Sequence, residues 1–171
     1  MASMQKVAGA IDTFIDRTGA VFAWSSFALV LVMATNVLLR YMYSLGSVWA
    51  QELEWHLLVP ISLLGMSYAL RHGEHVRVDI FFSGYSERPK LIIEIATSLA
   101  SIALCVIVVY LSYFYVLQSW NNNEGSANPG GIDYRYVLKA FIPFGFALLG
   151  LQSFADLLKF WIRFKALESR A

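Results

Sequence analysis

Four long apolar blocks separated by polar segments dominate the chain. They cover residues 20–43, 48–70, 91–118 and 136–160. Each block meets or approaches the length of about 20 apolar residues that a helix needs to cross a bilayer. The segments between them carry turn-forming residues, such as Ser44-Leu45-Gly46-Ser47 and the Asn, Gly and Pro residues of 119–135. The pattern predicts an all-α integral membrane protein, a single domain over residues 1–171 with four transmembrane helices.

A shorter amphipathic pattern covers residues 4–18, before the first apolar block. A helix of this kind lies along a membrane surface with its apolar side in the lipid. We therefore expect an N-terminal amphipathic interfacial helix, with a short extension of the first span as the alternative. Its apolar and charged positions recur on opposite sides at helical spacing: Val7, Ile11, Phe14 and Ile15 against Lys6, Asp12, Asp16 and Arg17.

Composition and charge agree with a membrane protein. Of the 171 residues, 58% are apolar and 15% charged, whereas soluble domains have about half and about a quarter. The net charge of +1 creates no field that would attract nucleic acid. Four spans place both termini on one side, and ten of the 13 Lys and Arg residues then lie on that side. The positive-inside rule therefore predicts a bacterial inner-membrane protein with cytoplasmic termini, 71–90 loop and 161–171 tail, and an outward-facing 119–135 loop.

The start of the second span holds several ionisable residues. Trp49, Glu52 and His56 share one helical face, whereas Glu54 points roughly the opposite way, so the two carboxylates are not a facing acid–base pair. The positive end of the helix dipole favours both, and Arg40, just across a short turn, is the expected partner of either. The residues form either an ion or proton site, or an interfacial charge cluster that fixes the first hairpin and docks a partner. The second interpretation is favoured.

Three other polar or helix-breaking residues lie in the spans. Asn36 is one polar residue in an otherwise apolar first span, and either a neighbouring helix or water at the outer end satisfies its amide. Pro60 and Pro143 lie in the second and fourth spans. A proline in a span frees a backbone carbonyl, which permits a broken-helix ion site. Because no matching inverted repeat is visible, we expect simple kinks instead.

Recognisable catalytic and cofactor chemistry is missing from the sequence. His56 lies near the outer side, whereas His72 and His75 lie at the cytoplasmic end, so they cannot share a haem iron. The sequence has no zinc motif, Gly-rich phosphate loop or nucleophile elbow. We expect no enzyme activity and no bound cofactor. Alternatives from other classes are a membrane anchor for a haem or quinone redox enzyme and a small channel. The histidine positions argue against the first, and the lack of a polar span face against the second.

An ordered set of short motifs runs along the four spans. In this order and spacing the chain resembles the small membrane subunit, or Q subunit, of tripartite ATP-independent periplasmic (TRAP) transporters, over about residues 5–165. The motifs are Asn36-Val37-Leu38-Leu39-Arg40-Tyr41, Trp49 with Glu52-Leu53, Gly65, His75-Val76-Arg77-Val78-Asp79, and Ile142-Pro143-Phe144-Gly145-Phe146-Ala147-Leu148-Leu149 with Leu151-Gln152.

The resemblance implies a role as a non-catalytic scaffold subunit. In this family a periplasmic binding protein captures a solute, commonly an organic acid, and a large membrane subunit moves it by a sodium-driven elevator-type motion. The small subunit braces the large one and helps receive the loaded binding protein. Sodium is then bound by the large subunit, and the solute is chosen by the other two components.

Several residues are candidates for contact with these partners. Arg77 and Asp79 are expected to tether the cytoplasmic loop to the large subunit. Apolar–polar alternation over 76–82 indicates a second interfacial segment lying along the lipid. The 119–135 loop is longer than in many relatives, and it either contacts the binding protein or the large subunit's outer face, or is a solvated connector. The full set of candidates is Asn36, Arg40, Trp49, Glu52, Glu54, His75, Arg77, Asp79, Glu124, Pro143 and Gln152.

Overall fold

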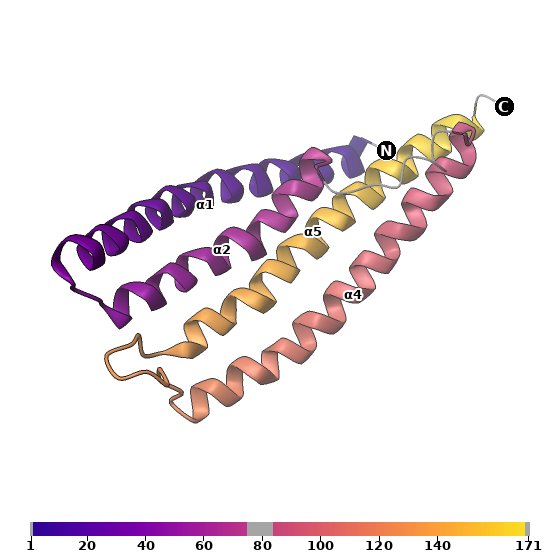
Figure 1. Cartoon of the computed structure of the whole chain (residues 1–171). Helices are drawn as coiled ribbons and strands as arrows, with labels where there is room; N and C mark the ends of the chain where they lie inside the picture. Colours follow the sequence, from indigo (N-terminus) through magenta and orange to yellow (C-terminus); the bar gives the residue numbers. More distant parts are fainter. Residues whose placement is uncertain (1, 75–83, 170–171) are drawn as a thin grey trace.

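The computed structural model describes residues 2–74 and 84–169, which form helices joined by short loops and contain no strand. Helix α1 covers Ala2–Tyr43, α2 Val48–His72, α4 Glu87–Asn121 and α5 Arg135–Glu168 (Figure 1). Each contains one predicted span, so the all-helical prediction is confirmed for this part of the chain. His75, Arg77, Asp79 and the expected second interfacial segment lie outside the described residues.

All four helices are long and apolar enough to cross a membrane. At 1.5 Å per residue, the 42 residues of α1 extend about 63 Å, and the 35 and 34 residues of α4 and α5 about 50 Å each. The hydrocarbon core of a bilayer is about 30 Å thick. The N-terminus of the chain, the start of α4 and the C-terminus all lie at one end of the molecule (Figure 1). The surplus helix length beyond the predicted spans is greatest at this end, which we call the terminal end.

The N-terminal segment 4–18 is not a separate helix. It forms the first part of α1, which continues without a break into the span. Its buried face is Ala8, Asp12 and Ile15, spaced at i, i+4 and i+7, whereas Val7 and Phe14 are 45% and 50% exposed. The amphipathic pattern put Asp12 opposite Ile15, on the side facing away from the lipid, whereas in the structure both residues share the buried face. The carboxylate is buried because cations from two other helices reach it, a tertiary effect that the local amphipathic pattern does not contain.

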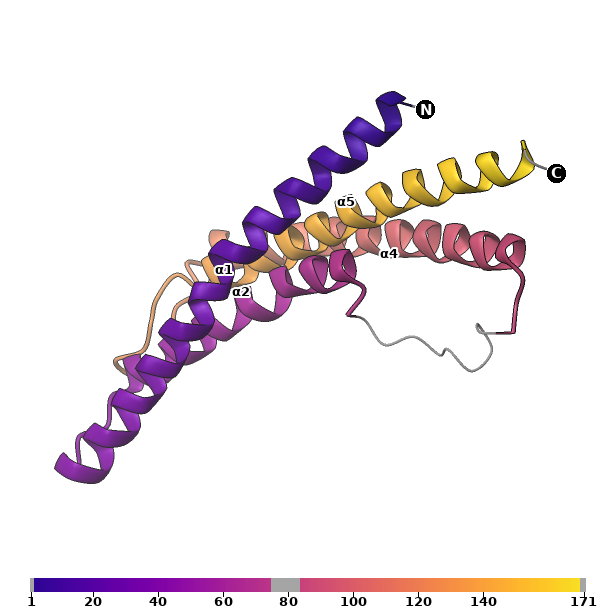
Figure 2. The same ribbon diagram turned by 90° about the horizontal axis from the view of Figure 1, so that it is seen from above.

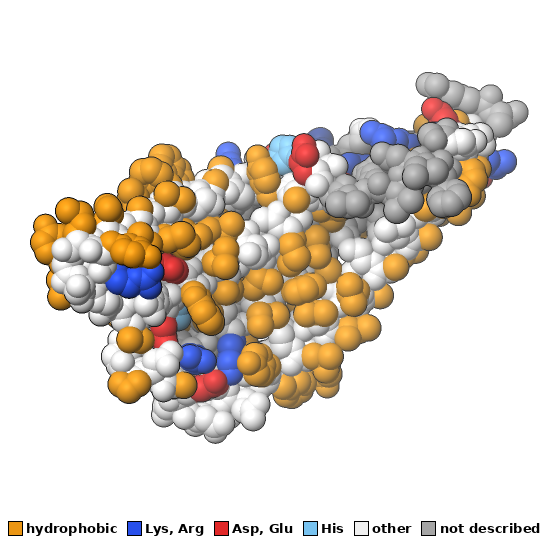
Figure 3. All heavy atoms as spheres, in the orientation of Figure 1, with side chains coloured by type: hydrophobic (Ala, Val, Ile, Leu, Met, Phe, Trp, Pro, Cys, Tyr) orange, Lys and Arg blue, Asp and Glu red, His pale blue; other side chains and the backbone are white. Residues whose placement is uncertain are grey.

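The helices form an open layer rather than a closed bundle. Helix α4 packs on α5, α5 on α2, and α2 on α1, while α1 also crosses onto α5 at an angle (Figure 2). Large apolar side chains are exposed along all four helices, and they cover much of the face in Figure 3. Such extensive exposed apolar surface would be anomalous for a soluble monomer and fits a lipid environment. Buried apolar residues are few: Ala8, Ile15, Leu64, Leu91, Cys105, Leu148 and Ala155.

A small apolar core joins α1, α2 and α5. Ile15, Leu64 and Leu148 contribute one side chain from each helix. Gly145 lets α5 approach α2, because a Cβ atom at this position would lie 2.8 Å from both the Cβ atom and the carbonyl oxygen of Leu63. Close backbone approach at small residues is the usual basis of helix association in membranes, since lipid removes the hydrophobic driving force.

Small polar residues line the contact between α4 and α5. The buried positions of α4 repeat every seven residues, twice the 3.5-residue period of helices that pack with a left-handed twist. Small side chains at most of these positions bring the two backbones together. Ser98 and Ser112 donate to carbonyls one turn earlier in α4, at 2.8 and 2.6 Å. The hydroxyl groups of Ser101 and Ser153 join the two helices at 2.8 Å. The seven-residue repeat comprises Leu91, Ser98, Cys105, Ser112 and Ser119.

The two prolines within spans do not interrupt their helices. Pro60 lies inside α2 and Pro143 inside α5, eight residues after its start, and helix continues on both sides of each. Neither position therefore forms the unwound segment that a broken-helix ion site requires.

Candidate functional site

The outer loop, residues 122–134 between α4 and α5, is tied to α2 by Glu52. Helix α2 begins with a Ser47 cap, whose hydroxyl oxygen accepts from Ala50 N at 3.3 Å, and Glu52 follows in the next turn. One carboxylate oxygen of Glu52 accepts from the Ser126 hydroxyl at 2.5 Å and the Asn128 amide at 3.0 Å. The other accepts from the backbone N–H of Ile132 at 2.7 Å. Its side chain is only 13% exposed, so this carboxylate is largely enclosed by the loop that it binds.

The loop backbone is folded around that carboxylate. Arg135 N donates to the Glu124 carbonyl at 3.1 Å, which closes the base of the loop, and Gly131 N donates to the Asn128 carbonyl at 3.0 Å. A Cβ atom at position 131 would lie 2.5 Å from Oε2 of Glu52, so the backbone can approach the carboxylate only because this residue is glycine. The Arg135 guanidinium lies 4.0 Å from the same carboxylate.

A second carboxylate anchors the start of the loop. Glu124 forms an ion pair with Lys139 of α5, and the Lys139 ammonium also lies over the Tyr115 ring, 4.0 Å from its centroid. The hydrogen bond from Lys139 lowers the pKa of Glu124 below its ordinary value of 4.5. Glu124 is therefore a charged anchor at neutral pH, and the loop is fixed at both of its carboxylates.

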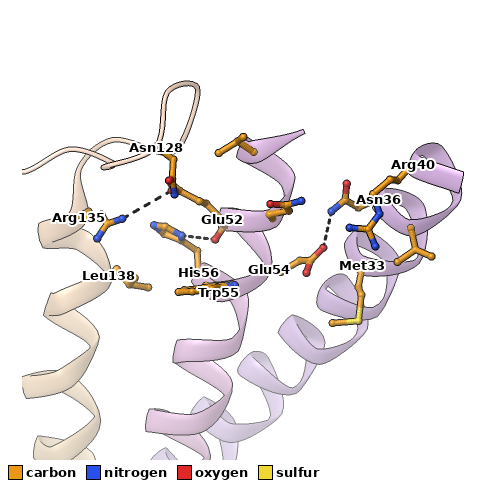
Figure 4. Close-up of a pocket in the computed structure, with 13 residues that line it drawn as sticks. Met33, Asn36, Arg40, Glu52, Glu54, Trp55, His56, Asn128, Arg135 and Leu138 are labelled. Carbon is orange, nitrogen blue, oxygen red and sulfur yellow. Dashed lines mark hydrogen bonds and ion pairs between the residues drawn. The ribbon is translucent and has the colours of Figure 1, made fainter. Parts of the chain in front are cut away.

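Glu54 points away from the loop and joins α2 to α1. Its carboxylate accepts from the Asn36 amide at 3.1 Å, so a neighbouring helix satisfies Asn36 (Figure 4). The prediction that Glu52 and Glu54 face opposite ways is confirmed. The prediction that Arg40 pairs with one of them was wrong, because within the described residues its guanidinium lies over the Tyr41 ring, 5.5 Å from the centroid. Asn36 and the outer loop provide the partners instead.

A cavity of about 360 Å³ with both polar and apolar walls lies between these contacts. His56 lies at its wall, with Nδ1 2.7 Å from the Glu52 carbonyl and Nε2 buried without a hydrogen-bond partner. No group of three or more His, Cys, Asp or Glu residues placed to hold a metal occurs in the described ranges. The cavity is lined by Met33, Asn36, Val37, Arg40, Val48, Gln51, Glu52, Glu54, Trp55, His56, Asn128, Arg135 and Leu138 (Figure 4).

Charged groups also gather at the terminal end, around Asp12. Oδ1 of Asp12 lies 3.3 Å from Nε of Arg71 in α2 and 2.7 Å from Nζ of Lys159 in α5. The Gln152 amide donates to the same oxygen at 3.2 Å. One carboxylate of α1 thus holds side chains from two other helices.

Two further carboxylates, Asp156 and Asp16, lie at the edge of this centre. Asp156 binds Lys159 at 2.9 Å, and Asp16 lies 3.7 Å from Arg71 and 3.1 Å from His72. We call these groups, with Asp12 and Gln152, the terminal-end cluster. Three carboxylates face two permanent cations and one histidine, so opposite charges are nearly balanced and the cluster serves to connect helices.

The predicted contact residues are scattered over the molecule rather than gathered in one site. Asn36, Arg40, Glu52 and Glu54 line the outer cavity, and Trp49 lines a neighbouring groove between α1 and α2. Among the rest, Glu124 lies in the outer loop, Pro143 within α5, and Gln152 in the terminal-end cluster with no exposed surface.

Comparison with known proteins identifies the family. A model of the DctQ component of tripartite ATP-independent periplasmic transporters matches residues 29–163. The chain belongs to this family. The matched part includes α2, α4, the outer loop and most of α5, and it begins after the Asp12 segment.

Two relatives of this DctQ-family chain are named as small permease proteins of TRAP transporters. The ectoine TRAP transporter small permease protein TeaB of Halomonas elongata is 28% identical over 151 residues, which cover 85% of this chain and 75% of TeaB. A Haemophilus influenzae protein, named as a TRAP transporter small permease, is 24% identical over 123 residues, covering 71% of this chain and 76% of the relative. The chain is thus a multi-pass inner-membrane protein from a family of transporter components, which are not enzymes.

The sequence did not indicate which residues bind Glu52 in the outer loop or Asp12 at the terminal end. Ser126, Asn128 and the N–H of Ile132 become ligands of Glu52 only when the loop folds back over α2. The one signal for this loop was its Asn, Gly and Pro content, which predicted an ordered turn. At the terminal end, the available signal for a buried ion pair was Asp12, which lies in a helical segment close to the apolar residues Ile11 and Phe14.

Proposed function

We propose that this chain is the non-catalytic scaffold subunit of a sodium-coupled, binding-protein-dependent secondary transporter for an organic acid or similar small solute. It braces the large membrane subunit and helps to dock the periplasmic binding protein. The observation that carries the proposal is the DctQ family match over residues 29–163. Sodium is used by the large subunit, so no ion site is assigned to this chain.

The architecture supports bracing more than conduction. Four long apolar helices stand in one layer, and their buried polar groups are largely used within the chain, as in the Asp12 centre and the Ser101–Ser153 contact. A solute path would need a continuous polar face along at least one helix. The charged clusters of the described residues instead lie toward the two ends, and the apolar surfaces between them suit lipid and a second membrane protein.

The proposed topology follows from the charge distribution. Both termini lie at one end of the layer and the outer loop at the other (Figure 1). The excess of Lys and Arg on the side of the termini supports a cytoplasmic location for that end and a periplasmic location for the outer loop. The Halomonas relative is named for ectoine. We infer a small organic solute here as well, selected by the binding protein and the large subunit.

The experiment is a pull-down of the tagged chain from detergent-solubilised native membranes, with partners identified by mass spectrometry. We expect one large multi-span membrane protein in amounts similar to the tagged chain, and no haem absorption. Untagged chain from the same strain is the control for non-specific capture. Recovery of a soluble dehydrogenase, of a haem protein or of the chain alone would refute the proposal and favour the redox-anchor alternative.

A further inference from the structure

The outer loop is held in one conformation by α2, a helix that it does not join. A connector between α4 and α5 needs only to span their ends. This one encloses the Glu52 carboxylate with two side chains and a backbone N–H, and places Gly131 where no Cβ atom fits. Tyr134, the last loop residue, also adopts a left-handed conformation with φ of 65°, which is uncommon for a residue other than glycine. The loop therefore has a defined shape, and Glu52 is the group that defines it.

The loop exposes an uncharged tip at the outer end of the layer, whereas the acidic Asp133 and the ring of Tyr134 are exposed at its base beside α5. Its exposed positions are mostly amide, small or backbone groups, and the tip carries no large apolar side chain. The two acidic side chains at the loop's anchoring points are occupied, since Glu52 faces inward and Glu124 is paired with Lys139. The tip extends past the ends of α4 and α5 (Figure 1). The exposed tip residues are Asn122, Asn123, Ala127, Asn128, Pro129 and Gly130.

We propose that Glu52 is a positioning residue that holds the 122–134 loop in the conformation that receives the periplasmic binding protein. This inference rests on the proposed function. A soluble partner matches the tip, because its amide and backbone groups offer hydrogen bonds to a water-soluble surface. A membrane-embedded partner would instead pack against apolar side chains, which the tip lacks. Glu52 acts through the loop and does not itself touch the partner, since its oxygens are already bonded.

The test is photocrosslinking of the complete transporter in intact cells. Ala127, exposed at the loop tip, is replaced by the photoreactive residue p-benzoylphenylalanine, and adducts are identified by mass spectrometry. We expect an adduct with the transporter's binding protein. Glu52→Gln added to this chain should lower the adduct yield at least about five-fold, because the carboxylate loses part of its hydrogen bonding to the loop. The control, Glu168→Gln, changes a carboxylate at the terminal end that pairs with Arg88, and should leave the yield unchanged.

A second variant covers the case in which Glu52→Gln fails to assemble. The double substitution Ser126→Ala and Asn128→Ala removes the loop side of the same hydrogen bonds and leaves α2 intact. It should produce the same loss of adduct while the large subunit still co-purifies. A yield unaffected by this double substitution would overturn the role of Glu52. An adduct with the large subunit alone, or no adduct, would overturn the assigned partner. The separate pull-down tests the proposed function. There, failure of the wild-type chain to recover a large subunit would refute that function.

Discussion

Asp12 is predicted to hold the N-terminal part of α1 onto the rest of the layer. The substitution Asp12→Asn removes the charge and keeps the size of the side chain. It weakens contacts with Arg71 at 3.3 Å, Lys159 at 2.7 Å and Gln152 at 3.2 Å, which come from α2 and α5. Few other contacts bind this segment, because Ala8 and Ile15 are its other buried residues. We therefore expect residues 2–18 to separate from the layer more readily in the variant.

The loss of unfolding free energy depends on which interactions Lys159 and Arg71 keep in the variant. Hydrogen bonds to charged groups contribute about 1.5–3 kcal/mol each, so the two that Asp12 accepts, from Lys159 and Gln152, set a limit of about 3–6 kcal/mol. The Lys159 and Arg71 side chains are 29% and 31% exposed, and each keeps a second carboxylate, Asp156 or Asp16. Solvent screening and these remaining partners reduce the cost to about 2 kcal/mol. The matched control is Asp16→Asn, because Asp16 is 39% exposed and at the edge of the cluster, and its loss should cost less than about 0.5 kcal/mol.

The assay is equilibrium unfolding of the purified chain in mixed detergent micelles, followed by helix content, together with hydrogen exchange of the N-terminal segment. Asp12→Asn should lower the free energy of unfolding and speed exchange at residues 2–18 while leaving α4 unaffected. Equal unfolding free energies for Asp12→Asn and Asp16→Asn, with unchanged exchange in both, would refute the reasoning. That result would mean that the terminal-end cluster contributes no net attachment of α1.

Three further predictions concern the other helix contacts. Gly145→Val should force α2 and α5 apart at Leu63 and lower the unfolding free energy by about 1–3 kcal/mol. The control Gly65→Ala has open space around the new methyl group and should be neutral or stabilising. Equal effects of the two substitutions would contradict the close approach of the helices. Ser153→Ala should cost about 0.6 kcal/mol through loss of the Ser101 contact, and no further loss is expected when Ser101→Ala is added. Because the pKa of Glu124 is lowered on folding, its contribution is complete above the ordinary value of 4.5 and is lost as pH falls below it through the lowered pKa. Protease cleavage of the outer loop should therefore increase below about pH 4.5 in the wild type, and Glu124→Gln should reduce that pH dependence.

The helices could be predicted from the sequence because the bilayer imposes a simple rule of length and polarity. The span at 48–70 and the helix at Val48–His72 differ by two residues at one end, and the other helices differ mainly by extension beyond the predicted spans. The opposite directions of Glu52 and Glu54 followed equally from helical geometry alone. These features depend on residues close together in the chain.

The partners of those side chains depend on contacts between distant residues. Glu52 binds residues 74 to 80 positions away, and Asp12 binds a lysine 147 positions away. No local pattern specifies such pairs, which is why Arg40 was the expected partner of the carboxylates and Asp12 was placed opposite Ile15. The heptad of small residues in α4 is different, since its period is visible in the sequence once helix packing rather than hydropathy is sought.

The distribution of polar groups limits how this chain can recognise its partners. Lipid tails are as apolar as leucine, so the exposed apolar faces of the helices give little preference for a protein over the bilayer. Preference must come from shape at small residues and from polar groups near the ends of the layer. At the terminal end most of those groups are engaged within the chain, as the contacts of Asp12 with Arg71, Lys159 and Gln152 illustrate. The outer loop is the opposite case, because its anchoring carboxylates face inward and its amide-rich tip remains exposed. Because Glu52 connects α2 to the loop, movement of the first hairpin relative to α5 would alter the surface that we propose receives the binding protein.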